Sequence, residues 1–297
     1  MNIMSLLNAL PGAVAQGLIW GIMAIGVYIT FRILDIADLT VDGSLMMIQG
    51  GSNVWVALLC AFLAGMLAGF ATGLFHTFMG IPAILAGILT QLGLYSVNLK
   101  IMGKSNQAIN VDKFDLLVSL RYIKNVAIYK NTILIVVVLI ILLVAVLYWF
   151  FGTELGCSLR ATGCNDKMAR AQGINTDFNR VLGLMISNGL VAFSGALLGQ
   201  YQGFSDINMG RGAIVIGLAG IIGEAIFGKI FRNFGLKLIA VAIGSIIYYF
   251  VLQIVIWFGI DTDLLKLLSA LVVAIFLAIP TWKSRYFSKP IRKGENH

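Results

Sequence analysis

Charged residues are scarce in this 297-residue chain. Asp, Glu, Lys and Arg make up 11% of it, whereas soluble domains carry about 25%. Hydrophobic residues make up 59%, and the mean hydropathy is +0.94. So little charge excludes a water-soluble globular enzyme and indicates a membrane protein. The net charge of +8 does not indicate a nucleic-acid partner, because the basic residues fall in short segments between apolar runs.

Residues that bind metals are also few. The three cysteines, Cys60, Cys157 and Cys164, contain no C-x-x-C pair and cannot form a disulfide framework. The two histidines, His76 and His297, are too few and too far apart in the sequence for a metal site. We therefore expect this chain to bind no metal.

Motifs of catalysis and nucleotide binding are missing too. No H-E-x-x-H or G-x-S-x-G sequence occurs, so we expect no catalytic residue. The nearest approach to a phosphate-binding loop is Gly103-Lys104-Ser105, but Asn98 stands where that motif requires its first glycine. We expect no cofactor bound by this chain. The first ten residues carry no positive charge, which also argues against a cleavable signal peptide.

Long apolar runs fill the chain instead. A helix that crosses a bilayer needs about 20 mainly apolar residues, because its backbone polar groups must pair within the segment. Eight segments qualify: residues 9–31, 54–78, 82–101, 131–151, 181–201, 212–228, 238–258 and 264–281. The stretch 40–52 is apolar but short, and three aspartates precede or interrupt it, so we expect a broken or re-entrant helix there. The sequence predicts an all-α polytopic transmembrane helix bundle of about 8–10 spans, with residues 1–297 as a single domain.

Lysine and arginine concentrate in three of the polar segments. Residues 152–180, 229–237 and 282–297 hold 12 of the 21, so the positive-inside rule places them in the cytoplasm, the last as a basic C-terminal tail. The other nine are then external. Six of these lie from Lys100 to Lys130, in and beside an external loop at 102–130, and the remaining three are Arg32, Arg211 and Lys266.

Glycines recur at helical spacing in three spans. The sets are Gly65-xxx-Gly69-xxx-Gly73, Gly195-xxx-Gly199-xxx-Gly203, and Gly217, Gly220 and Gly223. Small residues on one helical face let backbones approach closely, so we expect these faces to pack within the bundle. Sliding of the helices during a transport cycle is the alternative.

The 152–180 segment is a long polar stretch that contains one predicted short helix. Asn165 suits the N-cap, Asp166 adds negative charge to the first turn, and Gly173 suits the C-terminal end. An isolated helix of about seven residues is marginal in water. Docking into a groove on a partner protein is one interpretation, and an ordinary solvated connector is the other.

Three sequence elements, taken in order, resemble a known family. The first is Gly21-Ile22-Met23-Ala24-Ile25-Gly26 with Phe31-Arg32 and Ala37-Asp38-Leu39-Thr40-Val41-Asp42-Gly43-Ser44. The second is Ile81-Pro82-Ala83-Ile84-Leu85-Ala86-Gly87. The third is Arg160-Ala161-Thr162-Gly163-Cys164-Asn165 with Ala169 and Gly173-Ile174-Asn175. Together they cover about residues 12–228 and resemble ABC-importer permeases of the branched-chain amino-acid/ribose-type family.

The resemblance implies a type II ABC-importer-like fold and a transport subunit, not an enzyme, in the bacterial cytoplasmic membrane. Its implied partners are two cytoplasmic ATPase subunits that bind ATP-Mg, an extracytoplasmic substrate-binding protein and a second permease copy, expected to be identical. On this interpretation 152–180 is the cytoplasmic coupling loop, while the loop 102–130 and the turn 202–211 meet the binding protein. The residues expected to contact the ATPase are Arg160, Gly163, Asn165, Lys167, Met168, Arg170 and Gly173.

The T-V-D-G-S sequence at 40–44 is most similar to permeases paired with tryptophan/tyrosine-type binding proteins. We therefore expect an amino-acid substrate, aromatic or branched-chain, with a sugar or nucleoside as the alternative. An ion-coupled secondary transporter is a further rival, disfavoured because no charged residue except Glu224 is expected in the middle of a span. Candidate residues along the substrate path are Asp42, Ser44, Gln49, Gln200 and Gln253. A buried amide, however, more often makes an interhelical hydrogen bond.

Overall fold

The protein is described here from a computed structural model. It describes residues 3–34, 36, 53–108, 116–123, 131–207, 209–210, 216–218, 220, 223–224, 227, 231, 233–258, 264, 267–268, 270–271, 273–275 and 278. Within these ranges the α-helices are α1 (Ile3–Tyr28), α2 (Val54–Thr77), α3 (Ala83–Met102), α4 (Thr132–Gly152), α5 (Glu154–Cys164), α6 (Asp166–Ala171), α7 (Thr176–Gln202) and α9 (Phe234–Trp257). A π-helix, η1 (Ile29–Ile33), continues α1, and a 3-10 turn, η3 (Leu120–Ile123), precedes α4. Two short strands are β1 (Asn106–Ala108) and β2 (Phe204–Asp206).

The predicted all-α polytopic architecture is confirmed. Six helices among the described residues are long and apolar enough to cross a membrane: Ala9–Ile33, Val54–Thr77, Ala83–Met102, Thr132–Gly152, Thr176–Gln202 and Phe234–Trp257. Their ends lie near the predicted ones, except that α7 begins at Thr176, not near 181, because Asn175 caps a polar first turn that hydropathy does not detect. The expected span 212–228 lies mostly outside the described residues, the expected span 264–281 lies half outside them, and the expected broken helix at 40–52 lies wholly outside them.

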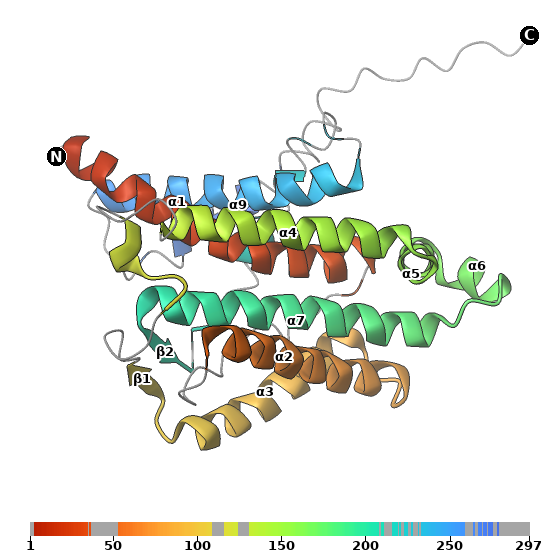
Figure 1. Cartoon of the computed structure of the whole chain (residues 1–297). Helices are drawn as coiled ribbons and strands as arrows, with labels where there is room; N and C mark the ends of the chain where they lie inside the picture. The colour runs from red at the N-terminus through yellow and green to blue at the C-terminus, as the bar shows by residue number, and fades with distance from the viewer. Residues whose placement is uncertain are drawn as a thin grey trace, which may run out of the picture.

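The bundle is built around α1, which is buried along most of its length. It packs against α9, α7 and α4, while α2 lies along α7 and α3 packs on the outer side of α2 (Figure 1). Two serine hydroxyls of α7 donate to backbone carbonyls of α1, Ser187 to Gly26 and Ser194 to Ile19, each at 2.7 Å. These bonds join α1 to α7 where the surrounding side chains are apolar.

Glycines bring α2 and α7 into close contact, as the first of the three glycine patterns predicts. A Cβ at Gly65 would meet the Asn188 carbonyl, and one at Gly69 would meet the Leu184 carbonyl. A Cβ at Gly73 would lie 3.0 Å from Val181 Cα. The two helices are therefore held at a separation that only glycine permits at these positions.

The third glycine pattern also packs within the bundle. Gly217 and Gly220 lie against Val27 and Ala24 of α1. In the second pattern, Gly203 does not extend the packing face of α7 but ends the helix, with φ of 75° in the left-handed region that glycine favours.

The two ends of the bundle differ in structure. At one end β1 pairs antiparallel with β2, Gln107 opposite Ser205, so part of the 102–130 segment lies beside part of the 202–211 turn. At the other end lie α5 and α6 (Figure 1). The end of α1 is at this second end, because Gly163 of α5 packs on the Ile33 carbonyl. Arg32 is therefore at the same end as 152–180, and its predicted placement on the opposite side is wrong.

Candidate functional site

The 152–180 segment contains two helices, α5 and α6, and not the single one that was predicted. Thr153 caps α5 by accepting a hydrogen bond from the Gly156 amide at 3.4 Å, and Glu154 lies in the first turn. Thr-Glu after an apolar run is a helix-start signal that identifies α5 in retrospect. One face of α5 is buried, through Leu159 and Thr162, because the helix lies across the end of the bundle.

The short helix α6 has the caps that the sequence indicates. The Asn165 side chain accepts from the Met168 amide at 3.1 Å. Gly173 adopts φ of 80°, and the Ile174 amide returns to the Ala169 carbonyl at 3.1 Å. At both ends of α6, backbone groups that would otherwise lack a hydrogen-bond partner are therefore paired.

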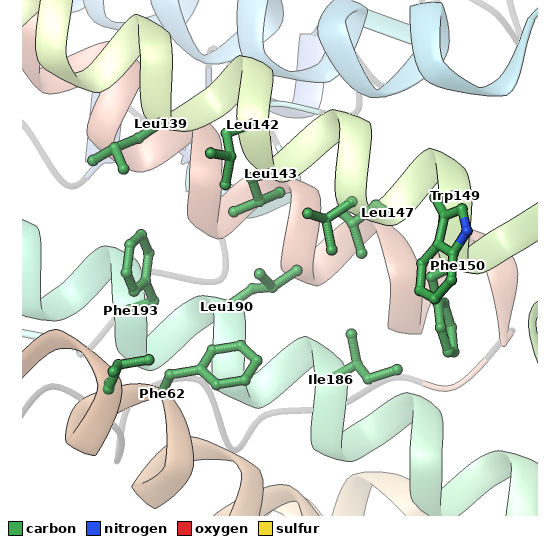
Figure 2. Close-up of a pocket in the computed structure, with 12 residues that line it drawn as sticks. Phe62, Leu139, Leu142, Leu143, Leu147, Trp149, Phe150, Ile186, Leu190 and Phe193 are labelled. Carbon is green, nitrogen blue, oxygen red and sulfur yellow. The ribbon is translucent and has the colours of Figure 1, made fainter.

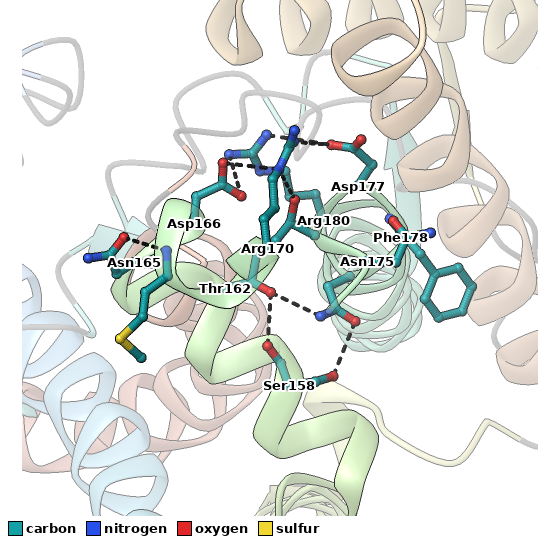
Figure 3. A network of polar contacts seen from close by, with 12 residues as sticks. Ser158, Thr162, Asn165, Asp166, Arg170, Asn175, Asp177, Phe178 and Arg180 are labelled. Carbon is teal, nitrogen blue, oxygen red and sulfur yellow. Dashed lines mark hydrogen bonds and ion pairs between the residues drawn. The ribbon is translucent and has the colours of Figure 1, made fainter. Parts of the chain in front are cut away.

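Two arginines and two aspartates attach α6 to the start of α7 (Figure 3). Arg170 pairs with Asp166 at 3.5 Å and with Asp177 at 2.9 Å, and its Nε donates to Thr176 Oγ1 at 2.7 Å. Arg180 pairs with the same two carboxylates, at 3.3 and 3.8 Å. Because each charge has two opposite partners, the four side chains form a closed network, which holds geometry better than an isolated surface pair. Arg170 thus fixes the orientation of α6 in the chain itself.

A buried polar contact attaches α5 to α7. Asn179 is 3% exposed, and its Nδ2 donates to Thr162 Oγ1 at 2.9 Å. Ser158 Oγ donates to Asn179 Oδ1 at 3.3 Å, so this one amide bridges two consecutive turns of α5. Asn179 was not among the predicted site residues, because a polar residue in the first turns of α7 has no distinctive sequence signal.

We predict that Asn179→Ala loosens α5 without unfolding the bundle. Removing one partner of a buried hydrogen bond costs about 1–3 kcal/mol, and here that cost falls on α5, since α7 keeps its other contacts. Hydrogen exchange should show faster exchange of α5 amides, with unchanged protection in α2. Ser158→Ala, which keeps the 2.9 Å bond, should have a smaller effect. Unchanged exchange in α5 would contradict the bridging role.

Two contacts join α5 to the membrane helices. Gly163 lies so close to the Ile33 carbonyl that a Cβ would overlap it, and the Leu34 Cα would be 3.0 Å away. The Arg160 guanidinium lies over the Phe234 ring, 5.7 Å from its centroid, a distance typical of a cation–π contact. α5 is therefore in direct contact with the end of η1 and with the start of α9.

The predicted ATPase-contacting residues fall into two groups. Lys167 and Met168 are exposed on α6, Met168 by 56%. Arg160, Gly163 and Arg170 instead make contacts within the chain, and Asn165 and Gly173 form the two ends of α6, as given above. Only the first group is free to form the centre of an intermolecular contact, although Arg160 and Arg170 also keep exposed surface.

The structure describes two of the five predicted substrate-path residues, Gln200 and Gln253. Gln200 is 1% exposed, and its Oε1 accepts from the Leu117 amide of the 102–130 loop at 3.3 Å. Gln253 is half-buried in α9. Asp42, Ser44 and Gln49 lie outside the described residues. Gln200 therefore makes a contact that positions the backbone at Leu117, as a buried amide does more often than it binds substrate.

An apolar cleft of about 470 Å³ lies between α4, α2 and α7. Figure 2 shows Phe62, Leu143, Leu190 and Phe193 directed into it, with Trp149 at one end. Its lining is hydrocarbon and aromatic, with the Trp149 indole as the one hydrogen-bonding group. A polar solute would lose its hydration there without replacement, so this cleft does not fit a path for such a solute.

Comparison with known proteins gives consistent similarities. Residues 10–279 match the family described as "Branched-chain amino acid transport system / permease component". The chain is 39% identical to the tyrosine transport system permease protein of Clostridioides difficile, over 92% of this chain and 91% of the relative. It is 37% identical to an uncharacterized protein of Rickettsia prowazekii, over 92% and 98%.

A more distant similarity covers part of the chain. The autoinducer 2 import system permease protein of Yersinia pestis is 29% identical over 56% of this chain and 46% of the relative. No solved structure matches the chain significantly.

Proposed function

This chain belongs to the family of branched-chain amino acid transport system permease components, and from that premise we propose that it forms the translocation path of an ATP-driven amino-acid importer. Membership makes it the permease component of an ABC transport system and a multi-pass inner-membrane protein, and such subunits are not themselves enzymes. The importer assignment agrees with the resemblance seen in three motifs of the sequence.

The proposed substrate is an aromatic amino acid. The observation that carries it is the 39% identity, over nearly the whole chain, to a protein named as a tyrosine transport system permease. The T-V-D-G-S motif at 40–44 supports the same class. A sugar or nucleoside remains the alternative, since the wider family includes import permeases for other solutes, such as the one named for autoinducer 2.

The proposed partner on the cytoplasmic side is a pair of ATPase subunits that bind ATP-Mg. This proposal is supported by the structure of α6. The helix is capped at both ends and is fixed to α7 by the network of Arg170 and Arg180. It is directed away from the bundle (Figure 1), and Met168 is exposed on it. A short rigid helix with an apolar tip fits a groove on another protein. We thus place 152–180 and the 282–297 tail in the cytoplasm, as a coupling loop and a basic C-terminus.

The opposite end is proposed to receive the extracytoplasmic binding protein. The paired strands β1 and β2 join the 102–130 loop to the 202–211 turn, and Gln200 further fixes the loop. A second identical copy of this chain is proposed to complete the path, as the family resemblance in the sequence implies.

The test is purification of the tagged chain with its neighbouring proteins, followed by reconstitution in lipid vesicles. We expect an ATPase subunit and a binding protein to be recovered, and labelled tyrosine to accumulate only with ATP and the binding protein. ATP-dependent accumulation of labelled ribose or nucleoside, with no accumulation of labelled tyrosine, would select the alternative substrate. Uptake that follows an ion gradient and ignores ATP would contradict the proposal.

We predict that Met168→Asp abolishes recovery of the ATPase subunit and reduces uptake to background. The carboxylate would have to be buried in the partner groove, at a cost of several kcal/mol, whereas α6 itself should keep its stability to within about 0.5 kcal/mol because the side chain is exposed. Met79→Asp is the matched control: Met79 is 61% exposed but lies in the α2–α3 turn. Normal ATPase recovery with Met168→Asp would refute docking through α6.

A further inference from the structure

Three charged side chains from three segments meet at the end of the bundle where α5 lies. Glu224 Oε2 is 3.6 Å from Arg32 Nε, and Glu224 Oε1 is 3.8 Å from Lys237 Nζ. The buried Tyr28 hydroxyl also hydrogen-bonds this carboxylate. The Glu224 side chain is 11% exposed, and a carboxylate buried to this degree is costly unless it is paired. The Glu224 carboxylate therefore joins Arg32 of η1 to Lys237 of α9.

Both elements that bear the cations touch α5 directly. Gly163 packs on the carbonyl of Ile33, the residue next to Arg32. Arg160 lies over Phe234, one turn before Lys237 on α9. A displacement of α5 therefore moves the backbone that carries Arg32 and the helix end that carries Lys237. The path from the 152–180 segment to Glu224 consists of direct contacts.

The element that carries Arg32 is a π-helix and does not have the hydrogen-bond register of an α-helix. In η1 the Leu34 amide bonds the Ile29 carbonyl at 3.0 Å, five residues back, where an α-helix would bond four back. Single π-turns of this kind occur mostly at functional sites. Reverting to the α register shifts the turn by one residue, which rotates the following side chains by about 100° around the helix axis. Such a change would carry Arg32 away from Glu224.

We propose that Arg32, Glu224 and Lys237 form a charge latch that keeps this end of the transport path closed, and that movement of the 152–180 segment opens it by separating η1 from α9. The proposal rests on the proposed function, because it assigns the latch to coupling between the ATPase-docking segment and the bundle. It assigns Glu224 a positioning role and no contact with substrate.

The test uses the full complex in lipid nanodiscs and vesicles, with ATPase rate and solute transported per ATP as readouts. With Glu224→Gln we expect the ATPase rate without binding protein to rise about fivefold, and transport per ATP to fall by a similar factor, because loss of the pairs shifts the population towards the open state. Arg32→Gln should act in the same direction and fold readily, since that side chain is 64% exposed.

The double variant Arg32→Gln/Glu224→Gln should be no worse than the more severe single one, because both remove the same contact. Arg32→Lys should retain most of the coupling.

Unchanged ATPase rate and unchanged transport per ATP in both single variants would overturn the latch. So would equal losses of ATPase and transport with their ratio preserved, because that pattern reports impaired assembly. Failure of the wild-type chain to assemble with an ATPase would overturn the proposed function and the latch together. If the wild-type complex is active and the variants have its ATPase rate and its transport per ATP, the latch alone is overturned.

Discussion

A Gly69→Val variant should fail to accumulate in the membrane as a folded protein. The Cβ alone would overlap the Leu184 carbonyl and lie 2.8 Å from Met185 Cα, so the obstructing atoms belong to backbone that cannot rotate away. Separating α2 from α7 would also open the contacts of Gly65 and Gly73 on the same face. Overpacking in a core costs about 1–3 kcal/mol and occasionally more, and we expect the upper end here because three glycine contacts share one interface.

The measurement is thermal unfolding in mild detergent, together with the yield of monodisperse protein. Gly93→Val is the matched control, because Gly93 lies within the spanning helix α3 and has nothing within 4 Å of the added Cβ. It makes the same change in helix propensity, so a difference between the two variants reports packing alone. Equal unfolding temperatures for Gly69→Val and the wild type would show that the α2–α7 contact is not essential.

The predictable part of this fold is the part that depends on nearest neighbours in sequence. Apolar runs predict the six described spans, since a bilayer admits few alternatives to a helix. The ends of α6 are predictable for a similar reason: Asn165 and Gly173 act on backbone groups within four residues of themselves. α5 was missed because its apolar and polar residues alternate around a helix that lies across the end of the bundle, so no long apolar run marks it.

Contacts between distant residues could not be predicted from one sequence. Glu224 is the one charged residue expected in the middle of a span, but the sequence around it does not identify Arg32 or Lys237 as its partners. The positive-inside count therefore placed Arg32 on the wrong side of the bundle. Gln200 shows the same limit, since its partner Leu117 lies 83 residues away. Such pairs depend on how helices are arranged around α1, and hydropathy carries no information on that arrangement.

The second large effect is expected at the junction between the 152–180 segment and the bundle. Gly163→Ala should reduce transport about five- to a hundredfold, because the added methyl carbon overlaps the Ile33 carbonyl and α5 must leave its position. An overlap of this kind costs about 1–3 kcal/mol. A free-energy change of that size lowers the equilibrium constant for docking of α5 by about five- to a hundredfold. α6 would move with α5, since Asn165 alone separates the two helices.

The effect of Gly163→Ala separates from misfolding because α5 lies outside the spanning helices. The unfolding temperature of the bundle should change little, whereas uptake and recovery of the ATPase subunit should fall together. Gly152→Ala is the control: this glycine is the last residue of α4, eleven residues before Gly163, and has nothing within 4 Å of an added Cβ. Wild-type transport by Gly163→Ala would show that α5 can shift without consequence. In that case the contact with Ile33 could not be the route by which the 152–180 segment acts on α1.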